Sequence, residues 1–137
     1  MPYSVKHDAA QGIVVVTFAE YITGDDLRNV TTVATTFQKQ TGVTRFLIDL
    51  NECEVTASYA DIYELPAEQY SNESVFRNSR IAVILPVSAS TQEAAQFYEN
   101  ACRNRGWNVQ LCPGRQNALR WLAGDAGYDD PEAFVSE

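Results

Sequence analysis

The chain has 137 residues, the size of one globular domain, which leaves no room for two independent cores. A hydrophobic content of 45% and an aromatic content of 11% exclude a disordered or collagen-like chain. Ten basic residues against eighteen acidic ones give a formal net charge of −8. A protein that neutralises phosphates would carry the opposite charge, so we expect no nucleic-acid partner.

The first half of the chain predicts a strand hairpin, a helix and a third strand. Residues 3–8 and 13–18 have strand patterns and are separated by a short glycine-containing turn, which predicts an antiparallel pair. Thr23 is expected to cap a helix whose apolar residues recur at helical spacing, and Gly42 to end it. A short apolar strand is predicted at residues 46–50.

The second half continues the alternation of helices and strands. Ser58 is expected to cap a second helix, which Pro66 breaks or kinks. An apolar strand at residues 81–85 precedes a helix that begins with a capping box at Ser90 and ends at Gly106.

The order of these elements predicts an α/β fold. A last strand at residues 107–112 leads into a final helix stopped by Gly124. Strands separated by single helices are expected to be parallel neighbours, so the sheet is a mixed, five-stranded one with an N-terminal antiparallel hairpin and about four helices. The second, third and fourth strands are apolar on consecutive residues and should be central. We expect one domain over residues 1–123 and an acidic tail over 124–137.

The three cysteines, Cys53, Cys102 and Cys112, form no Cys-x-x-Cys pair. This pattern argues against a disulfide framework or a zinc site, and predicts three reduced, buried thiols. The first residues lack the features of a signal peptide, and no apolar run approaches the ~20 residues of a membrane-spanning helix. The sequence therefore predicts a cytoplasmic protein.

The acidic residues gather in two stretches. Seven lie between Asp49 and Glu73 and five in residues 125–137, with no Lys or Arg in either, so the remaining six face all ten basic residues. Such stretches are expected to be solvated surfaces. The alternative is that the acidic second helix docks on a basic partner protein or on a second copy of the chain. The edge position of residues 107–112 also favours a homodimer.

The candidate site lies at the carboxyl ends of the parallel strands, where ligands bind in open α/β sheets. The loops expected there are residues 19–24, 51–58, 86–90 and 112–114. Asp49 could hold a polar ligand, or be satisfied by backbone donors of a helix. Ser58 could bind an anion or carry a phosphoryl group, or serve only as an N-cap. Ser88 lies in a similar cluster with Ser90 and Thr91.

The predicted second helix carries a broad apolar and aromatic surface, interrupted by Pro66, that consists of Tyr59, Tyr63 and Tyr70 with Ile62 and Leu65. Core packing explains this surface most simply. The alternatives are a movable lid over an apolar ligand and a surface that meets a membrane or a partner protein.

Motifs that carry catalysis are missing from the sequence. His7 is the one histidine, and no nucleophile-elbow, P-loop, dinucleotide-binding or zinc-protease pattern occurs. With one histidine and unpaired cysteines, a transition-metal site is not expected. We therefore expect no enzyme activity, no cofactor and no metal.

The opening hairpin and four short motifs resemble those of a known family. The motifs are Thr23-Gly24-Asp25-Asp26-Leu27, Arg45-Phe46-Leu47-Ile48-Asp49-Leu50, Arg80-Ile81-Ala82-Val83-Ile84 and Ala118-Leu119-Arg120-Trp121-Leu122. They are similar to the SpoIIAA-like family, small bacterial relatives of the STAS domains of anti-sigma-factor antagonists and sulfate-transporter tails, which are also grouped with CRAL-TRIO-type lipid-transfer domains. The resemblance covers residues 3–123.

The resemblance implies a non-enzymatic binding or regulatory module. It suggests a small apolar (lipid-like) or anionic ligand between the second helix and the carboxyl edge of the sheet, or peripheral membrane association. The alternative is a protein-interaction switch of the anti-sigma-factor-antagonist type, in which the serine at the start of this helix is phosphorylated. Here the stretch reads Thr56-Ala57-Ser58-Tyr59-Ala60 and keeps Ser58, but lacks that family's aspartate and glycine.

Overall fold

The computed structural model describes residues 2–124, so the predicted tail beyond Gly124 lies outside the described residues. The strands are β1 (Tyr3–Asp8), β2 (Ile13–Ile22), β3 (Arg45–Val55), β4 (Arg80–Ile84) and β5 (Asn108–Cys112). The helices are α1 (Gly24–Thr41), α2 (Tyr59–Glu64), the π-helical turn η1 (Leu65–Gln69), α3 (Tyr70–Asn72), α4 (Ala89–Arg103) and α5 (Arg115–Ala123).

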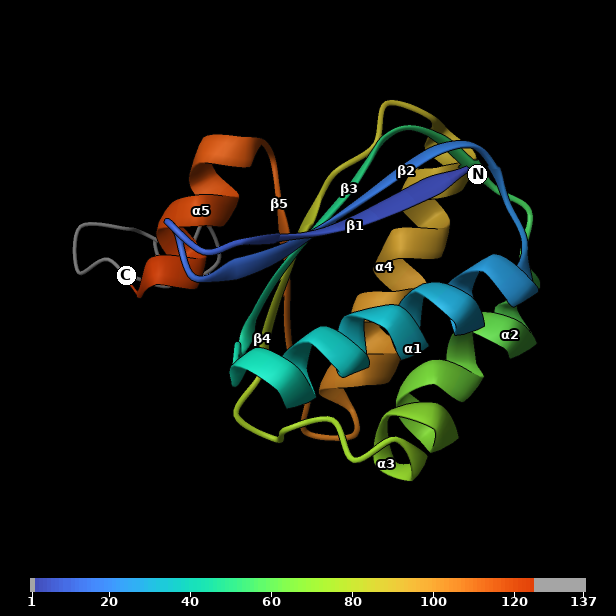
Figure 1. Ribbon diagram of the computed structural model, residues 1–137. Coiled ribbons are helices and arrows are strands. Elements are labelled where there is room, and N and C mark those ends of the chain that lie inside the picture. Colours follow the sequence, from blue (N-terminus) through green and yellow to red (C-terminus); the bar gives the residue numbers. More distant parts are fainter. Residues whose placement is uncertain (1, 125–137) are drawn as a thin grey trace, which may run out of the picture.

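The strands form one mixed sheet in the order β1-β2-β3-β4-β5. β1 and β2 are antiparallel, and every other neighbouring pair is parallel, as predicted. The predicted fold class and the edge positions of β1 and β5 are therefore confirmed. In Figure 1, α1, α2, α3 and α4 lie on one side of the sheet and α5 lies on the other.

Alternate residues of β2, β3, β4 and β5 contribute to two separate apolar cores, one on each face of the sheet. In β3, Phe46 and Leu50 pack toward α1, α2 and α4, whereas Leu47 packs with α5 residues such as Trp121 and Leu122. This alternation follows from the two-residue period of a strand. Burial of apolar area on both faces explains why the central strands are apolar on consecutive residues.

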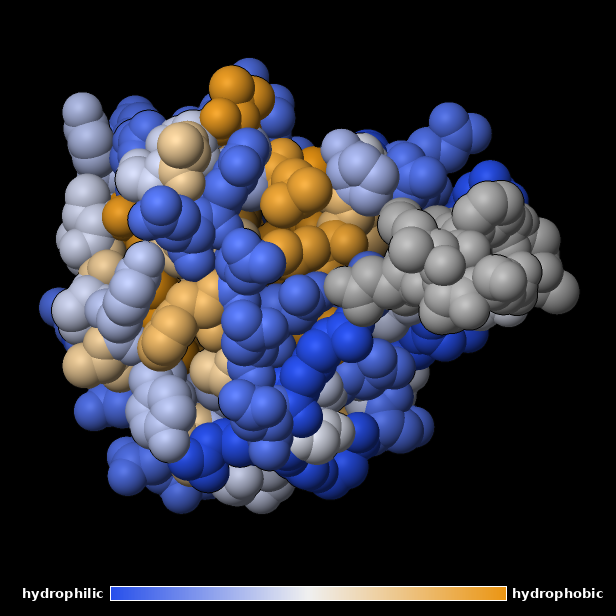
Figure 2. All heavy atoms as spheres, turned by 180° about the vertical axis from the view of Figure 1, so that it is seen from behind, coloured by the Kyte–Doolittle hydropathy of each residue, from blue (hydrophilic) through white to orange (hydrophobic). Residues whose placement is uncertain are grey.

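Part of the sheet face that α5 covers remains exposed to solvent. Thr17 and Asp49 are register partners on β2 and β3; Thr17 is exposed and Asp49 is half-buried. Val87, in the loop between β4 and α4, is 79% exposed. Seen from behind, apolar surface gathers on the side of the molecule that carries α5 (Figure 2).

Two strands are longer than the sequence patterns predict. β2 continues to Ile22 and β3 to Val55, so much of the expected loops 19–24 and 51–58 is paired strand. A register shift between Thr17 and Ala19 interrupts the ladder, and Glu20 adopts a positive φ of 61°. In this extension only Ile22 and Cys53 are buried, so the consecutive apolar residues that mark the inner strands end before it begins.

Helix caps mostly follow the predictions. Thr23 caps α1 in a capping box with Asp26, and Gly42 ends the helix in the left-handed region. The predicted cap of α4 is wrong: Ser88 caps this helix, while Ser90 lies inside it and donates its hydroxyl hydrogen bond to a carboxylate. α4 also ends before Gly106, which adopts its positive φ in the following turn.

The three cysteines are buried thiols and form no disulfide within residues 2–124, as predicted. Burial is the main cause that raises the pKa of Cys53 to about 11 and that of Cys102 to about 12. Both thiols are therefore protonated at neutral pH, which leaves them poor nucleophiles.

Candidate ligand cavity

Two adjoining cavities lie between the sheet and the helices that cover it. Their volumes are about 80 and about 60 Å³. The residues that line both are Val30, Thr31, Ile48, Tyr70 and Tyr98. The larger cavity extends under α2 and η1, where Ile62 and Leu65 form part of its wall.

Ile48 forms the floor of both cavities. It lies in the middle of the central strand, yet its side chain is only half-buried, because both cavities open onto it. Engineered apolar cavities of ~150 Å³ remain dry and bind benzene. Each of these two cavities is smaller, so it can hold part of an apolar molecule, and a longer apolar ligand requires the wall to move.

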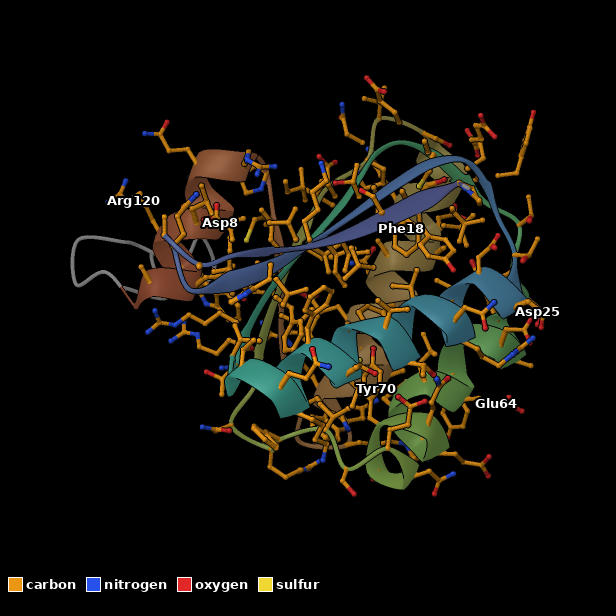
Figure 3. All side chains as sticks on the ribbon, in the orientation of Figure 1. Asp8, Phe18, Asp25, Glu64, Tyr70 and Arg120 are labelled. Carbon is orange, nitrogen blue, oxygen red and sulfur yellow. The ribbon has the colours of Figure 1, made fainter. Side chains whose placement is uncertain are left out.

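A pair of tyrosines supplies a polar group in this apolar wall. The hydroxyl oxygens of Tyr70, on α3, and Tyr98, on α4, are 2.5 Å apart, and both side chains are buried. Burial raises the pKa of each tyrosine, so both hydroxyls stay neutral. Figure 3 shows Tyr70 on the helical side of the sheet, close to α1. The pair can exchange its mutual hydrogen bond for one to a ligand's polar end.

The wall over the larger cavity is an irregular helical segment, residues 59–72, which we call the lid segment. It consists of α2, the π-helical turn η1 and α3. Pro66 lies at the start of η1, where its missing N–H interrupts the regular helical ladder. Such π turns are rare and occur frequently at functional sites.

Polar contacts attach the lid segment to α1. Arg28 of α1 forms an ion pair with Asp61 at 3.0 Å and another with Asp25 of its own helix. These contacts lower the pKa of Asp61, chiefly through the Arg28 hydrogen bond. Gln69 donates to the Arg28 carbonyl at 3.0 Å. Asp25 lies at the edge of the molecule in Figure 3, so solvent screens this side of the attachment.

Aromatic contacts attach the lid segment to α4 and the turn after it. Tyr59 stacks on Phe97 with ring centroids 4.7 Å apart. The Tyr63 ring lies under the Arg105 guanidinium, which also donates a hydrogen bond to the tyrosine hydroxyl. Both tyrosines remain substantially exposed, at 51% and 44%. The lid segment is thus held at its surface and faces a cavity beneath.

Comparisons with known proteins address the fold. No protein-family profile and no curated protein matches the sequence. One similar solved structure is the anti-sigma factor antagonist SpoIIAA in its unphosphorylated form, with 12% identity and a TM-score of 0.58 over 89% of this chain and 98% of that one. The chain has the SpoIIAA-like fold.

A second structure with the SpoIIAA-like fold, an uncharacterised DUF3478-family protein from Shewanella loihica PV-4, supports this assignment. It is 16% identical, with a TM-score of 0.55 over 88% of this chain and 91% of that one. The fold expected from the sequence motifs is therefore confirmed. Identities this low establish the SpoIIAA-like fold alone and leave the ligand to be inferred from the chain's own cavity.

The predicted site residues are not brought together in one place. Ile62 is 3% exposed and lines the larger cavity. Tyr59 and Tyr63 lie on the outer side of the lid segment, against α4 and the turn that follows it. Ser58 is exposed at the start of α2, where its hydroxyl accepts from the backbone N–H of Asp61 at 3.0 Å.

Asp49 and Ser88 lie away from the cavity. Asp49 is on the α5 face, and its carboxylate accepts from the backbone N–H of Asn51 at 2.9 Å, so its donor comes from its own strand rather than from a helix. Ser88, the cap of α4, lies near Glu54. Hydrogen bonds from Ser88 and Ser90 lower the pKa of Glu54.

Sequence patterns missed the tyrosine pair. Tyr98 belongs to the apolar stripe of α4, and Tyr70 to the aromatic surface predicted for the second helix, so neither pattern indicates that the two hydroxyls meet. Within residues 2–124, no three His, Cys, Asp or Glu side chains gather as a metal site would require. None of the described helices has the length and apolarity needed to cross a membrane.

The Arg28→Ala variant is expected to loosen the lid segment. Amide hydrogen exchange across residues 59–72 should accelerate roughly two- to fivefold, because the variant loses the ion pair with Asp61. The free energy of global unfolding should change little, because exposed ion pairs contribute little to stability. Mass-spectrometric hydrogen exchange measures both. The control is Arg115→Ala, which removes an arginine from exposed α5 surface. Unchanged exchange over 59–72 would show that Arg28 does not hold the lid segment.

Proposed function

We propose that the chain is a non-enzymatic binding module that takes a lipid-like ligand between its sheet and its lid segment. The observation that carries this proposal is the pair of adjoining apolar cavities between the sheet and the helices, the larger of which lies beneath α2 and η1. A well-packed interior has few voids larger than a water molecule, so adjoining cavities above a central strand are an unusual feature.

The ligand has a long apolar part and one hydrogen-bonding end. The lining side chains are almost all apolar, and the Tyr70–Tyr98 pair offers neutral hydroxyls. A fatty acid or fatty alcohol matches this lining. The ligand enters when the lid segment opens at its exposed contacts with α1, and opening would also present its apolar inner side to a membrane surface.

Native mass spectrometry combined with thermal shift tests this function. The probes are decanoic acid, palmitic acid, phosphatidylglycerol and ATP. We expect a complex of one fatty acid per chain and a higher melting temperature with the fatty acids, because a ligand that binds only the folded state stabilises it. Absence of binding by all the apolar probes would contradict the proposal.

A second candidate function is a protein-interaction switch at Ser58. The observation that favours it is that Ser58 is exposed at the start of α2 on a fold shared with an anti-sigma factor antagonist. A phosphoryl group there would add ~2 negative charges beside Asp61, whose carboxylate accepts from the Ser58 backbone N–H at 3.3 Å. Phosphorylation would therefore disturb the capping box and the start of the lid segment.

The Ser58→Asp variant tests this switch against Ser58→Ala. Loss of the N-cap should lower the unfolding free energy of Ser58→Ala by ~1 kcal/mol, as measured by urea denaturation. Pull-downs with the two variants should recover different partner proteins if Ser58 is a switch. Identical recoveries, with no phosphate on Ser58 in protein purified from its native cells, would exclude it.

A further inference from the structure

Two arginines lie side by side at the amino end of the sheet, on the face opposite the ligand cavity. Arg45 begins β3 and Arg80 begins β4, and the two are register partners. The residue that follows each arginine packs in the larger apolar core, so both arginine side chains lie on the opposite face of the sheet, the face that α5 covers. Neighbouring parallel strands are ~4.8 Å apart, so the two guanidinium groups share one small region.

Arg80 is fixed in place by α5. Its guanidinium lies over the Trp121 ring at 4.3 Å and donates from Nη2 to the Trp121 carbonyl at 2.5 Å. Its Nε is buried and has no hydrogen-bond partner within residues 2–124. Buried polar atoms of this kind normally have a partner, so this one indicates an unfilled acceptor position. Burial, and then the nearby charge of Arg45, lower the pKa of Arg80.

No described carboxylate neutralises the pair. The ion pairs within residues 2–124 involve Arg28 and Arg103 only. Asp8 lies at the same end of the molecule in Figure 3, but both its carboxylate oxygens accept from Gln11. Two adjacent positive charges, one of them partly buried, favour an anion between or beside them.

A groove adjoins Arg45 and gives the site its second component. Its volume is about 250 Å³, and it runs between the β1–β2 turn and the end of α5. Its lining residues are Gln11, Ile13, Arg45, Leu119, Leu122 and Ala123. The lining is therefore mostly apolar, with one cationic group and one amide.

We propose that Arg45 and Arg80 form a binding site for an oxyanion, a carboxylate or phosphate group carried on a small apolar body that occupies this groove. The guanidinium groups hold the charged end, and the leucines of α5 hold the apolar body. The site lies on the opposite side of the sheet from the cavity under the lid segment, so the two can be tested separately.

The oxyanion has two possible sources, a free small molecule and the chain's own carboxylates. Residues 125–137 contain five acids and no base, and follow Gly124 directly. A Cβ placed on Gly124, the last described residue, would be 3.7 Å from Arg80 Nη1, so the described part of the chain ends beside the pair. Both sources offer the same chemistry to the arginines.

Isothermal titration at low ionic strength, with butyl phosphate as the probe, tests the site. Five full-length chains are compared. Three are the unchanged protein, Arg45→Gln and the matched control Arg115→Gln. The fourth is a neutralised chain with Asp125→Asn, Asp129→Asn, Asp130→Asn, Glu132→Gln and Glu137→Gln, and the fifth is this neutralised chain with Arg45→Gln added. Arg45→Lys, which keeps the charge but loses the forked donor geometry, provides a second variant if Arg45→Gln is poorly folded.

The oxyanion comes from a free small molecule if the unchanged protein binds butyl phosphate and Arg45→Gln weakens this binding about tenfold or more. Arg115→Gln should then bind like the unchanged protein. The chain's own carboxylates are the source if only the neutralised chain binds and Arg45→Gln abolishes that binding. The proposal is overturned if neither the unchanged nor the neutralised chain binds, or if binding is the same with and without Arg45.

Discussion

The Gln38→Leu variant is expected to lose roughly 3 kcal/mol of unfolding free energy, because it leaves several buried polar groups without partners. Gln38 is fully buried in α1. Its Nε2 donates to the Val43 carbonyl at 2.9 Å and to the Ser79 hydroxyl at 2.8 Å, and its Oε1 accepts from the Phe76 backbone N–H at 2.8 Å. One side chain thus joins the end of α1 to the segment that leads into β4.

Urea denaturation of Gln38→Leu measures this effect. The matched control is Gln40→Leu, two residues away on the exposed side of the same helix, which should change the unfolding free energy by less than ~0.5 kcal/mol. A loss at Gln38 no greater than at Gln40 would mean that water replaces the side chain and that the three hydrogen bonds do not hold this region together.

The Ala95→Leu variant should lose fatty-acid binding while staying folded. Ala95 of α4 is 3% exposed and lines the larger cavity, so three added carbon atoms occupy the space that the ligand needs. Filling a cavity is commonly neutral or stabilising. We therefore expect at least a tenfold weaker decanoic acid affinity, together with an unchanged or higher melting temperature.

Displacement of a fluorescent fatty-acid analogue measures the affinity of this variant. The matched control is Ala60→Leu, the same change at an exposed position of α2, which should bind like the unchanged chain. Equal affinity for Ala95→Leu and Ala60→Leu would place the ligand somewhere other than the cavity under the lid segment.

The strand order could be predicted because burial leaves a clear pattern in short strands. Residues 81–84 are apolar on consecutive positions since β4 is covered on both faces, whereas β1 and β5 alternate at the edges. The caps at Thr23 and Gly42 followed local rules that need no tertiary contact. The prediction of a Ser90 cap failed because Ser88 is also a residue type that caps helices. In the structure the Ser88 hydroxyl accepts from the Thr91 backbone N–H, whereas the Ser90 hydroxyl donates to Glu54.

The candidate site was predictable only in part, because a cavity depends on how distant elements approach one another. The apolar spacing and Pro66 indicated an irregular second helix, and Ile62 does line the cavity. Tyr59 and Tyr63 follow the same spacing but turn outward, since α4 supplies partners for them at the surface. Nothing local to Tyr70 indicates a buried partner 28 residues away.

The most direct test of a ligand beneath the lid segment is a titration of isoleucine-methyl-labelled protein with decanoic acid, followed by NMR. Such a ligand should shift the methyl signals of Ile48 and Ile62, which line the cavity, and leave those of Ile13 and Ile84, which belong to the α5 core, unchanged. Shifts at Ile13 and Ile84 instead, or no shift at Ile48 and Ile62 at saturating ligand, would contradict a lipid-like ligand beneath the lid segment.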